Sequence, residues 1–227
     1  MTVRHHIREE MLLDYAAGTL SEGWGIAIAS HLALCPACRN HLAAMEGAAG
    51  ALLEKVIQSE GVDDSWDRFR ERLKDRPADT IDMGLARQTK AGVPPPVAPG
   101  AVLPEPLRSY LGSDVGGLKW RALGRGAYQI RIQTDDPSTQ VRLLRIPAGR
   151  PVPEHTHQGR ELTLVLSGSF RDGDQIFQRG DMEEADDDLL HTPVATEGED
   201  CICLAVTEAP LKFTSWIMRM IQPILKI

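Results

Sequence analysis

Three residues of the kind that bind metals lie close together early in the chain, as His31, Cys35 and Cys38 in a His-x3-Cys-x2-Cys pattern. Positions i, i+4 and i+7 share one face of a helix. Pro36 suits the first turn of a helix, so we expect His31 near the end of one helix and both cysteines at the start of the next. Imidazole nitrogen and thiolate sulfur are typical ligands of structural zinc. The spacing therefore predicts a zinc-binding corner between two helices.

A tetrahedral zinc site needs a fourth donor, and the His5-His6 pair near the N-terminus can supply it. We favour His6, which gives a Cys2His2 site that joins the first helix to the corner. Two other interpretations stay open: a buried Cys-x2-Cys pair in an apolar helix with a chance histidine nearby, and a thioredoxin-like redox pair. His41, on the helix after the corner, is not expected to be a ligand.

A second set of candidate ligands lies in the C-terminal half and comprises His155, His157, Glu161 and His191. Residues i and i+2 of a strand share a face, so His155 and His157 point the same way, and the next strand can bring Glu161 to that face. Three imidazole nitrogens and a carboxylate suit a divalent ion such as zinc, iron or manganese. The alternative is a set of surface histidines with a solvated glutamate.

Size and composition limit the classes of protein to which the chain can belong. Its 227 residues can hold one large domain or two small ones. No segment approaches the roughly 18 apolar residues of a membrane span, and the charged N-terminus is unlike a secretory signal. We therefore expect a cytoplasmic protein without a membrane partner. In that reducing compartment, four cysteines favour metal or redox chemistry over disulfides.

The net charge of −7 is shared by the two halves of the chain. Residues 1–76 carry 9 basic and 12 acidic side chains, and residues 77–227 carry 16 and 20. Direct binding of nucleic acid needs a basic face to neutralise phosphates, which neither half offers. We expect no direct nucleic-acid partner.

Residues 1–76 are predicted to form four short helices. The first covers Met11–Ala17 and ends at Gly18, and the second opens at Ser21 and runs to His31. The third runs from Pro36 to Val56, and the fourth follows the start signals Asp63, Asp64 and Ser65. This fourth helix is highly charged except for a narrow apolar stripe of Trp66, Phe69 and Leu73. The stripe either packs on its own domain or docks on a partner protein.

Residues 77–105 are predicted to be a semi-rigid linker, because proline-rich sequence around Val93–Gly100 favours an extended conformation. Residues 106–227 then change to period-two patterns rich in β-branched residues, which predict an antiparallel sandwich or barrel. The expected strands cover Thr139–Ile146, Glu161–Phe170, Gln175–Phe177 and Glu199–Thr207, with a hairpin turn at Asp172-Gly173. The tail, Phe213–Ile227, has apolar residues at helical spacing and is expected to cover the edge of the barrel.

The spacing of the second ligand set carries a resemblance to the cupin family. The first cupin motif, G-x5-H-x-H-x3,4-E-x6-G, is reproduced by Gly149, His155, His157, Glu161 and Gly168. The spacing of the second motif, G-x5-P-x-G-x2-H-x3-N, is kept from Gly180 to His191. Three of its residues are replaced, by Asp186, Asp188 and Ala195. These departures change the turn before His191 and leave the histidine in place.

The N-terminal half resembles the zinc-binding anti-sigma domain, whose signature is an N-terminal histidine followed by H-x3-C-x2-C on four helices. The cupin-like half that follows, together with the opening M-T-x-R-H-H, makes the whole chain similar to the ChrR-type anti-sigma factors. The resemblance implies a multidomain α plus β protein: a small four-helix zinc-binding anti-sigma domain and a C-terminal cupin. It also implies two Zn²⁺ sites, of which the cupin site could hold another divalent metal. The ligands implied for the first site are His6, His31, Cys35 and Cys38.

The resemblance further implies a transcriptional regulator and not an enzyme. Its partner would be an extracytoplasmic-function sigma factor, released in response to singlet oxygen or organic hydroperoxides. The alternative functions are a metal-dependent cupin enzyme of the dioxygenase kind and a metal-stabilised adaptor for another protein. Cys201 and Cys203 lie in an apolar strand, where either plain packing or a redox role is open.

Overall fold

The computed structural model describes residues 2–56, 65–74, 100–124, 126–186, 189–209 and 212–213. Most of the predicted linker, residues 77–99, and most of the predicted tail, residues 214–227, lie outside these ranges. So do Asp63 and Asp64 of the predicted helix start and Asp188 in the turn before His191.

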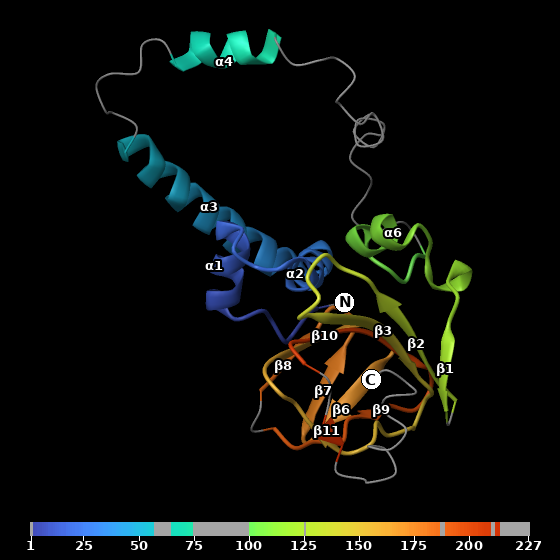
Figure 1. Ribbon diagram of the computed structural model, residues 1–227. Helices are drawn as coiled ribbons and strands as arrows, with labels where there is room; N and C mark the ends of the chain where they lie inside the picture. Colours follow the sequence, from blue (N-terminus) through green and yellow to red (C-terminus); the bar gives the residue numbers. More distant parts are fainter. Residues whose placement is uncertain are drawn as a thin grey trace.

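The N-terminal helices form where local signals predict them (Figure 1). Helix α1 (Glu9–Ala17) ends at Gly18, whose φ of 68° is the left-handed conformation that closes many helices. Helices α2 (Glu22–Leu34) and α3 (Pro36–Val56) meet at the predicted corner, and α4 covers Ser65–Lys74. Beyond the linker, α6 (Glu105–Leu111) is followed by a 3-10 turn, Val115–Gly117.

The predicted four-helix domain is confirmed only in part. The described residues hold five α-helices, because α6 follows the four that were predicted. Helices α1, α2 and α3 pack together, and α6 packs on α2. Helix α4 keeps its apolar stripe exposed, with Trp66 at 62%, Phe69 at 47% and Leu73 at 50% exposure. The physical reason is that a three-residue stripe on a charged helix buries too little apolar surface to hold the helix against its neighbours.

The C-terminal half is an antiparallel β structure, as predicted. A six-stranded sheet has the order β1-β2-β3-β10-β5-β8, a three-stranded sheet the order β7-β6-β9, and β4 pairs with β11. The strands are β1 (Arg121–Gly124), β2 (Ala127–Ile132), β3 (Gln140–Ile146), β4 (His155–Thr156), β5 (Glu161–Ser167), β6 (Ser169–Asp172), β7 (Gln175–Gln178), β8 (Met182–Ala185), β9 (Val194–Ala195), β10 (Cys201–Thr207) and β11 (Lys212–Phe213). Two of the expectations need correction. Gly168, with a φ of 65°, divides the long predicted strand into β5 and β6, and Phe213 begins the tail in a strand.

The large sheet is covered on both faces. Leu162, Leu164 and Leu166 of β5 join one hydrophobic cluster with Leu12 and Ile28 of the helices. Val165, on the opposite face of β5, packs in a second cluster with residues of β6 and β7. Figure 1 shows the helices on one side of the β structure. The main hydrophobic core is therefore shared across the boundary predicted between the two halves.

Helix α2 approaches the sheet closely because glycine stands where it meets β3. A Cβ at Gly23 would lie 2.7 Å from Val141 Cγ2 and 2.8 Å from Thr139 Cγ2. Trp24, the next residue, is buried with the guanidinium of Arg160 5.3 Å from its ring centroid. The start of α2 is thus held against the sheet.

None of the helices in the described part of the chain is both long enough and apolar enough to cross a bilayer.

Candidate metal centres

The α2–α3 corner is built as its sequence predicts. Cys35 separates the two helices, and its N–H donates to the carbonyl of His31, 2.8 Å away. Pro36 begins α3, and Cys38 follows in its first turn, with its N–H 3.5 Å from Cys35 Sγ. His31, Cys35 and Cys38 are all buried. The backbone of the corner therefore brings these three side chains together.

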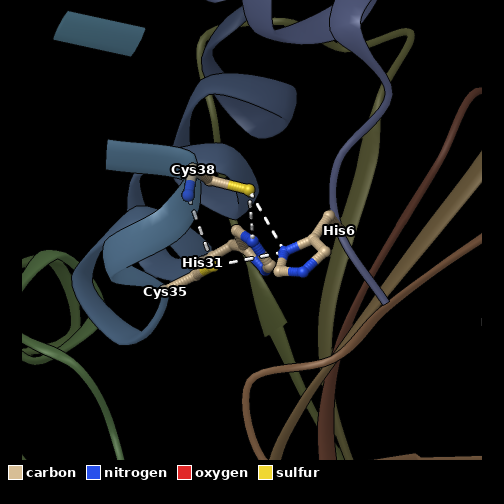
Figure 2. Close-up of side chains that lie close together, drawn as sticks. All are labelled: His6, His31, Cys35 and Cys38. Carbon is tan, nitrogen blue, oxygen red and sulfur yellow. Dashed lines mark hydrogen bonds between the residues drawn. The ribbon is translucent and has the colours of Figure 1, made fainter. Parts of the chain in front are cut away.

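His6, and not His5, approaches this corner (Figure 2). Its Nδ1 lies 3.3 Å from Cys35 Sγ and 3.5 Å from Cys38 Sγ, and His31 Nε2 lies 3.3 Å from Cys38 Sγ. His5 instead places its ring 4.3 Å from that of Phe177 and its Nδ1 3.4 Å from Asp181. The side chain of His6 is exposed, so the group has one face toward solvent.

The spacing of these four donors fits a tetrahedral zinc ion. Zinc bonds of about 2.3 Å to sulfur and about 2.0–2.1 Å to nitrogen place the two donors about 3.6 Å apart at the tetrahedral angle. The observed nitrogen to sulfur distances of 3.3–3.5 Å are close to that separation. The donor set, two sulfurs and two nitrogens, is also one that zinc uses in structural sites.

Burial keeps His31 and Cys38 uncharged when no cation is bound. Burial and the neighbouring His6 ring lower the pKa of His31 to about 4, so its imidazole is neutral at pH 7 and ready to bind a metal. Burial raises the pKa of Cys38 to about 11, so the thiol keeps its proton unless a cation compensates the thiolate. A bound divalent ion would supply that compensation.

The cupin histidines converge in the same way. His155 and His191 face each other across a β-bridge, and their Nε2 atoms are 3.2 Å apart. The Nε2 atom of His157 lies 3.0 Å from that of His191, and all three rings are buried. Ligand bonds of about 2.0–2.1 Å place two nitrogens about 2.9–3.3 Å apart for octahedral and tetrahedral angles. The three Nε2 atoms therefore fit one shared ion.

The outer nitrogen of each of these rings faces an oxygen. The Nδ1 atoms of His155 and His191 lie 2.8 Å from the Pro153 carbonyl and from Asp172 Oδ2. The Nδ1 atom of His157 lies 3.2 Å from Glu161 Oε2. Metal-bound histidines commonly hold their second nitrogen against such an acceptor, which fixes the orientation of the ring. The three rings are thus oriented with Nε2 toward one point.

Glu161 is placed differently from the expectation. The described residues give a group of His155, His157 and His191 alone, and the Glu161 carboxylate lies beyond the His157 ring. Its other oxygen accepts a hydrogen bond from Thr163. The reason is local: His157 directs Nε2 to His191, so its Nδ1, and the carboxylate against it, face away from the shared point.

Two acidic residues near His191 were not assigned to the site by the sequence. Asp172, Glu183 and His191 each place one donor atom within 4.8 Å of the others. Burial, and then the nearby Asp172 and Glu161 carboxylates, raise the pKa of Glu183 to about 8. Asp172 belongs to the Asp-Gly turn, a pattern that predicts a hairpin and no ligand, and its neighbour His191 is 19 residues away.

Cys201 and Cys203 are both buried in β10, as the packing interpretation expects. The neighbouring Cys201 thiol, and then burial, raise the pKa of Cys203 well above its ordinary value. Because the thiolate is the reactive form of cysteine, this environment lowers its reactivity.

Known proteins are similar to both halves of the chain. A family model, the ChrR Cupin-like domain, matches residues 111–211. Anti-sigma-E factor ChrR of Cereibacter sphaeroides is 42% identical over 230 residues, covering all of both chains. A chain in the crystal structure of Rhodobacter sphaeroides SigE in complex with the anti-sigma ChrR is 39% identical, with a TM-score of 0.67 over 91% of this chain and 99% of that one.

The enzyme alternative does not survive this comparison, because the similarity extends over the full length to a regulator, even though the cupin fold is shared with enzymes. The protein belongs to the ChrR family of anti-sigma factors.

Proposed function

We propose that the protein is an anti-sigma factor that binds an extracytoplasmic-function sigma factor in the cytoplasm and thereby keeps it from core RNA polymerase. The observation that carries this proposal is the exposed apolar stripe of α4, Trp66, Phe69 and Leu73. The rings of Trp66 and Phe69 stack with their centroids 5.5 Å apart. Aromatic side chains displayed in this way are the usual anchors of a protein interface. The related ChrR is itself described in complex with SigE.

In this proposal a Zn²⁺ ion bound by His6, His31, Cys35 and Cys38 stabilises the helices that lie next to the interface. Short helices are marginal on their own, and a structural zinc ion contributes its binding free energy to folding. His6 lies before α1 whereas the other three donors lie at the α2–α3 corner, so the ion ties all three helices together. Loss of the ion would loosen the surface that contacts the sigma factor.

We further propose that residues 106–227 are the sensory domain and that residues 1–76 are the anti-sigma domain. The sensory domain would hold a divalent ion through His155, His157 and His191. Glu161, the predicted fourth ligand, would join them by turning its carboxylate from Nδ1 of His157 toward the ion. The signal would be singlet oxygen or an organic hydroperoxide. In support, His191 lines an open cavity of about 1140 Å³, through which a small oxidant can reach the site.

Co-expression with each extracytoplasmic-function sigma factor of the source genome tests the proposed function. The native chain is expected to co-purify with at least one of them in a defined complex. Replacing either Trp66 or Phe69 by alanine should weaken that complex by about 30-fold or more, since an interface anchor contributes about 2 kcal/mol or more. Ile176→Ala, which removes an equally exposed apolar side chain from β7, is the matched control. Failure of every sigma factor to bind the native chain would refute the proposal.

A further inference from the structure

The segment Val3–Arg8, which we name the N-terminal strap, lies against the cupin half at the start of β8. The N–H groups of Arg4 and His5 both donate to Oδ1 of Asp181, at 2.6 and 3.0 Å. The carbonyl of His5 accepts a hydrogen bond from the N–H of Met182, 3.1 Å away. The next residue in the strap is His6, the ligand that approaches the cysteines. The cupin half thus holds the backbone immediately before one donor of the zinc site.

Asp181 is built into the fold as a fixed acceptor. Its side chain is almost fully buried, and its second oxygen accepts a hydrogen bond from the N–H of Gln178 at 2.8 Å. The carboxylate therefore accepts from three N–H donors, two in the strap and one at the end of β7. An asparagine has a single acceptor oxygen, so its NH2 group would face at least one of these donors. The position needs a carboxylate.

The turn before β8 also lies beside the α2–α3 corner. A Cβ at Gly180 would lie 3.6 Å from Leu34 Cβ, at the end of α2. Val3 packs over Gly180, where a Cβ would lie 2.8 Å from Val3 Cγ2. The turn is thus in contact with the strap and next to the α2–α3 corner.

Strand β8 links this turn to the cupin histidines. Successive side chains of a strand face opposite sides. Met182 packs in the core shared with the helices, and Glu184 pairs with Arg8 at the far end of the strap. Glu183, between them, faces the other way and lies in the group with Asp172 and His191. One strand therefore contacts the strap on one face and the cupin site on the other.

We propose that Asp181 is a positioning residue for the zinc ligand His6, and that β8 couples occupancy of the cupin site to the metal affinity of the α2–α3 corner. This inference rests on the zinc site proposed above. Coupling between two sites is reciprocal, so an ion at the histidines must change the affinity at the cysteines by the same factor as the reverse. A change at the cupin site would reach the sigma-binding helices through His6.

Cobalt(II) substitution in the full-length chain gives a readout specific to the cysteine site, because sulfur to cobalt charge-transfer absorption reports Cys35 and Cys38 alone. Asp181→Asn is expected to lower the cobalt affinity of this site by about 10- to 100-fold, the usual loss when the support of a ligand is removed. Asp174→Asn is the matched control, because it removes the same charge from an exposed position on the hairpin that follows Asp172. Equal affinities in the two variants would overturn the positioning role.

The coupling is tested by introducing His155→Ala, which disables the cupin site, into the native chain and into the Asp181→Asn chain. In the native background, the cobalt affinity of the cysteine site should differ between His155→Ala and the native chain by about fivefold or more. In the Asp181→Asn background the same comparison should show no difference. An equal effect of His155→Ala in both backgrounds, or no effect in the native one, would contradict the coupling. Absence of the charge-transfer band from the native chain would instead refute the zinc site itself.

Hydrogen exchange in the unmutated chain covers the case in which Asp181→Asn does not fold. The Arg4 and His5 amides, which donate to Asp181, should exchange at different rates when the cupin site is loaded with zinc and when it is stripped. The amide of Gly112, which caps α6 by donating to the Arg108 carbonyl at 2.8 Å, should not change. Identical protection of Arg4 and His5 in the two states would overturn the proposal.

Discussion

Asp172 Oδ2 lies 2.8 Å from Nδ1 of His191, on the opposite side of the ring from the atom that faces His155 and His157. A carboxylate at this position orients the ring and strengthens its second nitrogen as a ligand. The aspartate of a hairpin turn thereby becomes part of the cupin site.

Replacing Asp172 by asparagine should therefore lower the affinity of the cupin site for a divalent ion by about 10- to 100-fold. Competition with a chelator, measured on a chain that carries Cys35→Ser and Cys38→Ser, isolates this site from the other one. Asp174→Asn serves as the control because Asp174 is two residues away and exposed. An unchanged affinity in the Asp172 variant would show that the contact has no role in binding.

The metal-free protein should lose stability in mild acid. Burial is the first cause that lowers the pKa of both His31 and His155 from 6.5 to about 4. The unfolded chain binds a proton at each histidine below about pH 6.5, whereas the folded chain does so only near pH 4, so stability falls as the pH falls between these values. The loss is at most roughly 3 kcal/mol for each histidine.

Urea unfolding of the metal-free chain at several pH values measures this dependence. His31→Gln and His155→Gln should each flatten the decline between pH 6.5 and 4. His41→Gln, which replaces an exposed histidine, should leave the slope as it is in the native chain. A decline of equal steepness in all three variants would assign the effect to other groups.

Alanine substitutions at two glycines of α2 should have opposite effects on stability. A methyl group at Gly23 would lie 2.7 Å from Val141, so Gly23→Ala should destabilise the protein by about 1–3 kcal/mol through overpacking. Gly25 has open space at the same point, and Gly25→Ala should stabilise the helix by up to about 1 kcal/mol. Because α2 and β3 share one core, thermal unfolding monitored on the helices and on the sheet should shift together in the Gly23 variant. Separate transitions would contradict the shared core.

The two metal sites should differ in their effect on the sigma factor. Cys35→Ala or Cys38→Ala should abolish binding, because each removes a zinc ligand from the corner that joins the helices. His155→Ala should leave binding in place, because the cupin histidines lie in the other half. Titration of each purified variant with the co-purifying sigma factor measures the difference. A complete loss of binding in His155→Ala would refute the proposed division of labour between the halves.

Local patterns were sufficient to predict most elements of the fold. Gly18 and Pro36 mark a helix end and a helix start because their backbone preferences act within a single turn. The period-two pattern likewise predicts the strands of the C-terminal half. The His-x3-Cys-x2-Cys spacing places three donors of the first site, because all three belong to one corner.

The remaining features depend on contacts that no local pattern contains. Arg4 and Asp181 are 177 positions apart, and nothing near either residue indicates that they pair. The contact of this segment with Asp181 turns His5 toward Phe177 and leaves His6 facing the cysteines. The packing of α6 on α2 and the exposure of α4 depend in the same way on which apolar surfaces meet across the chain.

Sigma-factor binding by the metal-stripped chain tests the central claim most directly. The protein is stripped of metal with a chelator under reducing conditions, and its affinity for the co-purifying sigma factor is measured before and after one equivalent of zinc is restored to the cysteine site. We predict that the stripped chain does not bind and that restored zinc recovers the complex. Tight binding by a folded chain that contains no metal would contradict the account.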